Sequence, residues 1–339
     1  MSNQRNGSWS RREFLSTAAV AGTGALLGLR SDSLAAEPPP ETTKLRLIRS
    51  AMCQAPQHVS GELLRSEGFS DVQEVKIEGV RADLLRALAA GEGDITSTYV
   101  GPLIARIDAG DAIVVISGLH AGCFRLYATE RIQSLRDLKG KNIAVSAIGD
   151  GGYAFLASMM TYVGLNPQKD VHWVTHATKE FPRLLAEGKI DAYMDVPTEP
   201  PDSQAKIGRM IVNSAMDRPW SQYFCCMVAA NREFVRKNPV AVKRSLRAIL
   251  KATNICALEP ERTTRLLVDK GYTKNYDYAL ERLKDIPYGK WRDYDPEDTM
   301  RFYALRLHEA SMIKSSPQKI IAQGTDWRFL RELKKELKT

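Results

Sequence analysis

The 339-residue sequence lacks the short motifs that mark the common hydrolases. It has neither the Gly-x-Ser-x-Gly elbow that exposes a serine nucleophile nor the His-Glu-x-x-His pattern that places zinc ligands on a helix. Ser316 and Lys319 have Ser-x-x-Lys spacing, but Pro317 marks Ser316 as a helix cap, and the companion motifs are missing. We therefore expect no catalytic residues and a protein that is not an enzyme.

Cysteine is scarce and irregularly spaced. The chain has five cysteines, and the positions are Cys53, Cys123, Cys225, Cys226 and Cys256. An odd, scattered set is unlike the framework of a disulfide-stapled domain, although up to two bridges could form. The apolar run 223–228 predicts that the adjacent pair lies in a buried strand, where cysteine packs as a small hydrophobe.

Histidine is equally sparse, and its spacing does not favour a metal site. His120 lies three residues before Cys123, so the two could form a soft-metal site with Cys53. No close Cys or His pair shares their loop, however, and we expect no metal and no cofactor. His172 and His176 are four residues apart across a strand end, which does not make a chelating pair.

The N-terminus has no apolar run of the roughly 20 residues that a membrane-spanning helix needs. The run 17–29 has about a dozen residues, three of them glycine, and no cysteine follows it at a cleavage point to carry a lipid. It follows Ser10-Arg11-Arg12-Glu13-Phe14-Leu15 and precedes the small residues of Ser33-Leu34-Ala35. This order predicts a twin-arginine signal peptide over residues 1–35, cleaved after Ala35, and export of the folded protein to the periplasm by the twin-arginine translocation machinery.

Strong charge of one sign is also missing from the predicted mature chain. Its formal charge falls from +8 to +6 without residues 1–35, and basic and acidic residues alternate. This distribution does not indicate nucleic-acid binding. About 300 residues at 44% apolar composition suffice for one large or two medium domains.

What the sequence does have is an internal repeat. The segments 84–95 and 182–192 resemble each other, with Gly91 and Gly188, and likewise Asp94 and Asp191, both 97 residues apart. The same offset carries the predicted strand 45–49 onto 142–146 and carries 72–77 onto a segment with a second predicted strand. Each unit therefore reads as strand, helix, strand, helix, strand, which predicts two α/β lobes with mainly parallel sheets.

Ligands of open α/β sheets bind beyond the carboxyl ends of the strands, near helix N-termini. The repeat places such strand ends, here called rims, in both lobes. We expect the two rims to face each other across a hinged cleft. The candidate ligand-binding residues on the two rims are Cys53, Gln54, Ser97, Thr98, Tyr99, His120, Gly149, Asp150, Gly151, His176 and Asp195.

Gly149, Asp150 and Gly151 form the most distinctive part of these rims. Glycines at a helix start expose backbone N–H groups, a common anion site, although a tight turn without any ligand is the alternative. Ala154 replaces the third glycine of a dinucleotide fingerprint, and no phosphate-loop lysine follows. The carboxylate of Asp150 repels a phosphate or sulfonate, and together with Asp195 it favours an amine or another hydrogen-bond donor.

Four segments resemble the exported substrate-binding proteins of ABC transporters, of the nitrate, sulfonate, taurine and thiamine-precursor group. They are the strand near Leu45, the turn 88–95, the Leu-x-Asp-Leu-x-Gly-Lys stretch 135–141 that leads into strand 142–146, and 184–192. The resemblance covers about residues 44–313. Members that bind sulfonates carry hydroxyl residues where this chain has Gly149-Asp150-Gly151, a departure that disfavours sulfonate and nitrate.

The resemblance implies a type II periplasmic-binding-protein fold and a monomeric receptor that delivers a small solute to an ABC permease. With the repeat it assigns 36–43 to a spacer, 44–122 and 231–339 to the first lobe, 130–221 to the second, and 123–129 and 222–230 to hinge crossovers. A related branch makes the thiamine pyrimidine in the cytoplasm, using iron and a cysteine-rich motif that this chain lacks. An exported enzyme or metal-binding protein on the same fold is therefore the alternative.

Overall fold

The computed structural model describes residues 37–77, 81–195 and 208–337. The predicted signal peptide, residues 1–35, lies outside this part of the chain. Residues 39–339 form one compact unit, which contains all the elements below. No helix in the described residues is both long and apolar enough to cross a membrane.

The first of two five-stranded sheets has the order β2-β1-β3-β10-β4. Its strands are β1 Lys44–Ile48, β2 Asp71–Val75, β3 Ile95–Tyr99, β4 Ile113–Ala121 and β10 Phe224–Asn231. β1 is parallel to β2 and β3, and β10 is antiparallel to both of its neighbours. Four strands therefore point one way, and the late strand β10 fills the gap between β3 and β4.

The second sheet repeats this pattern in the order β7-β6-β8-β5-β9. Its strands are β5 Arg125–Ala128, β6 Asn142–Val145, β7 His172–Thr175, β8 Ala192–Asp195 and β9 Arg209–Asn213. β6 is parallel to β7 and β8, while β5 is antiparallel to β8 and β9. The first strands of the two sequence repeats are thus β1 and β6, and the third strands are β3 and β8.

The helices that follow these strands close each repeat. In the first sheet they are η1 Met52–Gln54, α2 Ala55–Val59, α3 Gly61–Ser66, α4 Arg81–Ala90 and α5 Val100–Asp108; in the second they are η2 Leu135–Leu138, α6 Gly151–Tyr162, η3 Thr178–Glu180, α7 Phe181–Ala186 and η4 Trp220–Gln222. Gly91 and Gly188 follow α4 and α7 with φ of 77° and 70°, a left-handed conformation that glycine adopts without steric cost.

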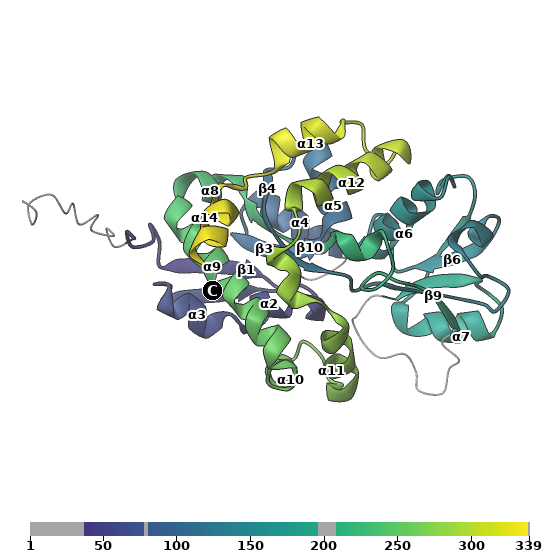
Figure 1. Cartoon of the computed structure of the whole chain (residues 1–339), viewed down its shortest axis with the longest axis horizontal. Helices are drawn as coiled ribbons and strands as arrows, with labels where there is room; N and C mark the ends of the chain where they lie inside the picture. The colour runs from purple at the N-terminus through teal and green to yellow at the C-terminus, as the bar shows by residue number, and fades with distance from the viewer. Residues whose placement is uncertain (1–36, 78–80, 196–207, 338–339) are drawn as a thin grey trace, which may run out of the picture. The chain divides into compact units, whose positions relative to one another are not determined.

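The C-terminal third of the chain is helical. Its elements are α8 Arg232–Lys237, α9 Pro239–Leu258, α10 Pro260–Asp269, α11 Tyr276–Asp285, η5 Tyr288–Arg292, α12 Pro296–Glu309, α13 Pro317–Gly324 and α14 Arg328–Glu336. Pro at the first position of α9, α10 and α12 suits a helix start. α9 and α14 pack on the first sheet, and α12 contacts both α5 and α6, as Figure 1 shows.

The chain passes between the sheets twice, through residues 122–124 and 214–223. The two connections are packed together, because the Ser214 hydroxyl accepts hydrogen bonds from Cys123 N at 3.1 Å and Phe124 N at 2.9 Å. Gly122, with φ of 45°, lies so close to Ala215 that a Cβ would overlap its backbone. A side chain at position 122 would therefore force the connections apart.

Candidate functional site

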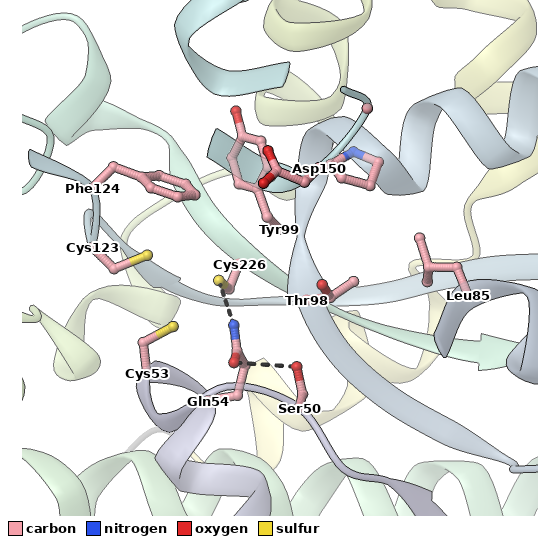
Figure 2. A pocket seen from close by; sticks show the side chains of 13 residues that line it. Ser50, Cys53, Gln54, Leu85, Thr98, Tyr99, Cys123, Phe124, Asp150 and Cys226 are labelled. Atoms are coloured by element: carbon pink, nitrogen blue, oxygen red, sulfur yellow. Dashed lines mark hydrogen bonds between the residues drawn. The ribbon is translucent and has the colours of Figure 1, made fainter. Parts of the chain in front are cut away.

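A small pocket lies between residues of the two sheets. Its walls are drawn in Figure 2. They are formed by Ser50, Cys53, Gln54, Leu85, Thr98, Tyr99, Pro102, Cys123, Phe124, Gly149, Asp150, Gly151 and Cys226. The pocket therefore combines the ends of β1 and β3, the first connection, the start of α6 and one side chain of β10.

The first-sheet wall is built on polar side chains at strand ends. Gln54, in the short helix after β1, accepts a hydrogen bond from the Ser50 hydroxyl at 3.2 Å and donates one to Cys226 Sγ at 2.9 Å. Thr98 and Tyr99 end β3. The Tyr99 ring packs edge-on against Phe124 at 4.9 Å between centroids, and its buried hydroxyl has no hydrogen-bond partner in the described residues. This wall is lined by the Gln54 amide, the hydroxyl-bearing residues Ser50 and Thr98, and the aromatic Tyr99.

The second-sheet wall is the N-terminus of α6, and Asp150 is its cap. The Asp150 carboxylate accepts hydrogen bonds from Tyr153 N at 2.7 Å, from Ala147 N at 3.2 Å and from the Ser146 hydroxyl. The helix therefore has a resident carboxylate where an anionic ligand would bind. Among the lining residues that the structure describes there is no Arg or Lys, and Asp150 is the one acidic side chain.

Four cysteines meet at the pocket, and three of them line it. The sulfur atoms of Cys53, Cys123 and Cys226 lie within 4.8 Å of one another and converge in Figure 2. Cys225 Sγ lies 2.8 Å from Cys123 Sγ and 4.0 Å from Cys226 Sγ. All five cysteines of the chain are free and buried. Cys53, Cys123 and Cys226 are the residues that could hold a thiophilic metal ion.

His120 makes one thiol of this cluster different from the others. It is fully buried opposite Cys226 in the β4–β10 pairing, and its Nδ1 contacts the Ala121 carbonyl at 3.0 Å. Burial alone would lower the pKa of His120, but the negative charge and hydrogen bonding of Cys226 raise it to about 10. Burial raises the pKa of the Cys226 thiol, whereas the neighbouring thiols of Cys123, Cys225 and Cys53 and the positive charge of His120 lower it well below its usual value. The arrangement favours a Cys226 thiolate beside a His120 imidazolium.

The structure brings seven of the candidate ligand-binding residues into the pocket wall. They are Cys53, Gln54, Thr98, Tyr99, Gly149, Asp150 and Gly151. His120 lies behind the wall, and the buried Ser97 hydroxyl donates to the Gln57 side chain at 2.8 Å. His176 is exposed at the end of β7 and does not line the pocket.

Asp195 is directed to a different partner. Its carboxylate forms an ion pair with Arg282 Nη1 of α11 at 3.2 Å, and Arg282 Nη2 donates to the Cys123 carbonyl at 2.8 Å. Burial raises the pKa of Asp195, while the positive charges of Arg282 and Arg125 oppose this shift. Asp195 does not line the pocket, and its contacts join the end of β8 to the first connection between the sheets.

Sequence reasoning did not name six residues of the pocket wall. They are Ser50, Leu85, Pro102, Cys123, Phe124 and Cys226. Cys123 and Phe124 lie three and four residues after the candidate His120, so an extension of that rim segment would have included them. Cys226 carries no such signal, because the repeat does not predict that β10 inserts between β3 and β4.

Comparison with known proteins identifies relatives of two kinds. Residues 71–263, more than half of the chain, match the family described as NMT1/THI5 like. The 4-amino-5-hydroxymethyl-2-methylpyrimidine phosphate synthase THI13 of Saccharomyces cerevisiae is 23% identical over 248 residues, which cover 68% of this chain and 72% of that protein.

Solved structures of similar fold include periplasmic binding proteins and the desulfurization enzyme DSZB, which has a TM-score of 0.56 at 12% identity, covering 87% of this chain and 99% of that one. The nitrate-binding protein NrtA from Synechocystis PCC 6803 has a TM-score of 0.71 at 14% identity, covering 88% of this chain and 90% of that one. The aliphatic sulphonate-binding protein SsuA from Escherichia coli has a TM-score of 0.62 at 18% identity, covering 85% and 94%. These similarities confirm the predicted two-lobed α/β periplasmic-binding-protein fold.

Proposed function

Because the chain belongs to the NMT1/THI5-like family, we propose that it is a periplasmic receptor that binds a small polar solute and delivers it to an ABC permease in the inner membrane. The observation that carries this proposal is a single pocket with walls from both sheets. A ligand there contacts Gln54 and Tyr99 on one side and the start of α6 on the other. The same ligand then holds the two lobes together, as a transport receptor requires.

The lining residues support a solute that is uncharged or positively charged. The described wall offers no Arg or Lys to neutralise an anion, and Asp150 repels one. The wall is instead lined by the acidic Asp150, the hydroxyl-bearing Thr98 and the aromatic residues Tyr99 and Phe124. Hydrogen-bond donors on a compact, partly flat solute match these groups best.

The lobes and the hinge complete the proposal. We assign residues 44–122 and 231–339 to the first lobe, 130–221 to the second, and 123–129 and 222–230 to the hinge crossovers. In the described parts of the chain, both crossovers begin outside the sheets and continue into a sheet strand, β5 of the second sheet and β10 of the first. We further propose export by the twin-arginine route, with cleavage after Ala35.

A thermal-shift and native mass-spectrometry screen of the mature protein tests the proposal. The probes are amino acids, amines, pyrimidines, nitrate and alkanesulfonates. We expect one uncharged or cationic compound to bind with 1:1 stoichiometry and to stabilise the protein by about 2.7 kcal/mol at a hundredfold excess over its dissociation constant. A nitrate or sulfonate that stabilises more than every neutral or cationic probe would contradict the proposed solute class.

An enzyme related to the yeast synthase is the second candidate, and the buried thiol cluster favours it. Cofactor content separates the two functions. We expect the purified mature protein to carry no stoichiometric metal and no bound chromophore. Elemental analysis that finds one metal ion per chain, or a visible absorption band, would favour the enzyme over the receptor.

A further inference from the structure

Two thiols of the cluster are closer to each other than any other measured pair in it. Cys123 Sγ and Cys225 Sγ are 2.8 Å apart, and both side chains are buried with exposed fractions of 6% and 2%. Cys123 also lines the pocket, so it is the member of the pair that lies next to a small reagent in the pocket. Cys225 is not among the lining residues and lies behind Cys123.

This pair also occupies a special place in the fold. Cys123 lies in the first connection between the sheets, and Cys225 is the second residue of β10, directly after the second connection. Ser214 and Gly122 already press the two connections together. A covalent bond between the two sulfur atoms would fix one connection to the other at the point where both lobes join.

We propose that Cys123 and Cys225 are a redox-active pair that a small disulfide oxidises through the pocket, forming a disulfide that ties the two connections together. This property goes beyond solute binding and does not depend on which solute the pocket takes.

The chemistry is thiol–disulfide exchange in two steps. Cys123 Sγ attacks one sulfur of the small disulfide, which forms a mixed disulfide and releases the first reagent thiol. Cys225 Sγ then attacks Cys123 Sγ, closes the protein disulfide and releases the second reagent thiol. The two cysteine protons end on the two released thiols. The cysteine pair loses two electrons, and the reagent gains them.

The surroundings of Cys226 explain why it is not the partner of choice. Its sulfur accepts a hydrogen bond from Gln54 Nε2 at 2.9 Å and lies opposite the buried His120. Cys226 Sγ is 4.0 Å from Cys225 Sγ, whereas Cys123 Sγ is 2.8 Å from it, and a disulfide at Cys226 would also disrupt the hydrogen bond from Gln54. Exchange among the four sulfur atoms therefore ends with Cys123 joined to Cys225 and with Cys226 free.

The test is oxidation of the full mature protein with 2-hydroxyethyl disulfide, followed by thiol counting and peptide mapping. We expect wild type to lose two thiols without a retained reagent group and to give one cross-linked peptide pair, Cys123 to Cys225. Oxidation should raise Tm by about 5 °C, because the bond closes a long loop. Dithiothreitol should reverse both changes.

Two serine variants provide the comparison. Cys225→Ser should neither form the cross-link nor gain Tm, whereas Cys256→Ser, which removes a buried cysteine of α9 outside the cluster, should behave as wild type. If Cys225→Ser does not fold, the wild-type peptide map decides alone. A bond from Cys123 to Cys53 or Cys226, a mixed disulfide that persists, or five unreacted thiols would each overturn the proposal. So would a stoichiometric metal ion that protects the cluster.

Discussion

In both halves of the molecule, an aspartate before the third strand, β3 or β8, forms the same pair of hydrogen bonds with the backbone of the first strand. The two halves differ in the charge of the residue that the aspartate contacts. In the first half, Asp94 N donates to the Arg46 carbonyl at 2.8 Å, and its carboxylate accepts from Arg46 N at 2.7 Å. In the second half, Asp191 N donates to the Asn142 carbonyl at 2.8 Å, and its carboxylate accepts from Asn142 N at 2.9 Å. Only Asp94 adds an ion pair, with Arg46 Nη2 at 2.6 Å.

The comparison separates what the repeat encodes from what the site needs. The Gly-x-x-Asp spacing ends a helix and aligns the next strand, which is a folding task common to both halves. The pocket is lined where the halves differ, by the thiol and amide of Cys53 and Gln54 in one and by the capped helix start at Asp150 in the other. The residues that the two halves share therefore determine the fold, and the residues that differ between the halves form the pocket.

The largest expected effect comes from Asp94→Ala. This change removes the carboxylate that accepts a hydrogen bond from Arg46 N. It also leaves the Arg46 guanidinium, on a side chain that is one-third exposed, without its ion-pair partner. We expect the free energy of unfolding to fall by about 3 kcal/mol, against about 1 kcal/mol for Asp191→Ala. Urea titration of both variants measures the difference. Equal losses would show that the ion pair adds nothing to the shared backbone bonds.

A second difference between the halves is the burial of their histidines, which affects how stability depends on pH. His58 in α2 is buried, stacks on Tyr272 at 3.8 Å and contacts the Ala51 carbonyl through Nε2 at 3.0 Å, whereas His172 and His176 in the second half are exposed. Burial lowers the pKa of His58 to about 3, and the charges of Arg49 and Lys270 act in the same direction.

The pH dependence follows from this lowered pKa. The unfolded chain protonates His58 as pH falls below about 6.5, whereas the folded protein does so only near pH 3. This contribution to stability is complete above pH 6.5 and is lost on acidification towards pH 3. Urea titrations at several pH values from 7 to 4 measure how steeply the free energy of unfolding falls with pH. This fall should be less steep in His58→Gln than in wild type, and as steep as in wild type in His176→Gln. Identical slopes in all three proteins would refute this origin.

The smallest expected effect is at the helix cap of the second half. Asp150→Ala should lower the free energy of unfolding by about 1 kcal/mol, and Asp150→Asn by a few tenths, because Asn also caps. Asp295→Ala, which removes the Asp cap of α12 outside the pocket, should cost about as much as Asp150→Ala. Denaturant titration compares the three. A loss from Asp150→Asn as large as that from Asp150→Ala would show that the charge, and not the cap, stabilises α6.

Much of the fold could be predicted from the sequence because each repeat unit is marked by residues close together in the chain. Gly91, Asp94 and their counterparts mark helix ends and strand starts within one unit, so the order of strands and helices follows from short-range patterns. The insertion of β10 between β3 and β4 is a pairing over more than a hundred residues, and its apolar sequence fits any buried strand. Cys226 reaches the pocket only through that pairing.

The sequence predicted the candidate site to the same extent as the fold, through short-range patterns. Rim positions after the strands gave seven of the lining residues, Cys53, Gln54, Thr98, Tyr99, Gly149, Asp150 and Gly151, since the carboxyl ends of parallel strands share an edge. Asp195 occupies an equivalent position, but Arg282 of the later helix α11 pairs with it. A contact between distant segments can redirect a side chain whose strand position is known.

The central claim, that one ligand contacts both halves, is tested most directly by titration calorimetry with the compound found in the screen. Gln54→Ala changes the first-sheet wall, Asp150→Asn changes the second while keeping the cap, and Asp295→Asn is the control outside the pocket. We predict that both pocket variants raise Kd at least tenfold, about 1.4 kcal/mol each, and that the control leaves it unchanged. Wild-type affinity in either pocket variant would contradict a ligand held between the two halves.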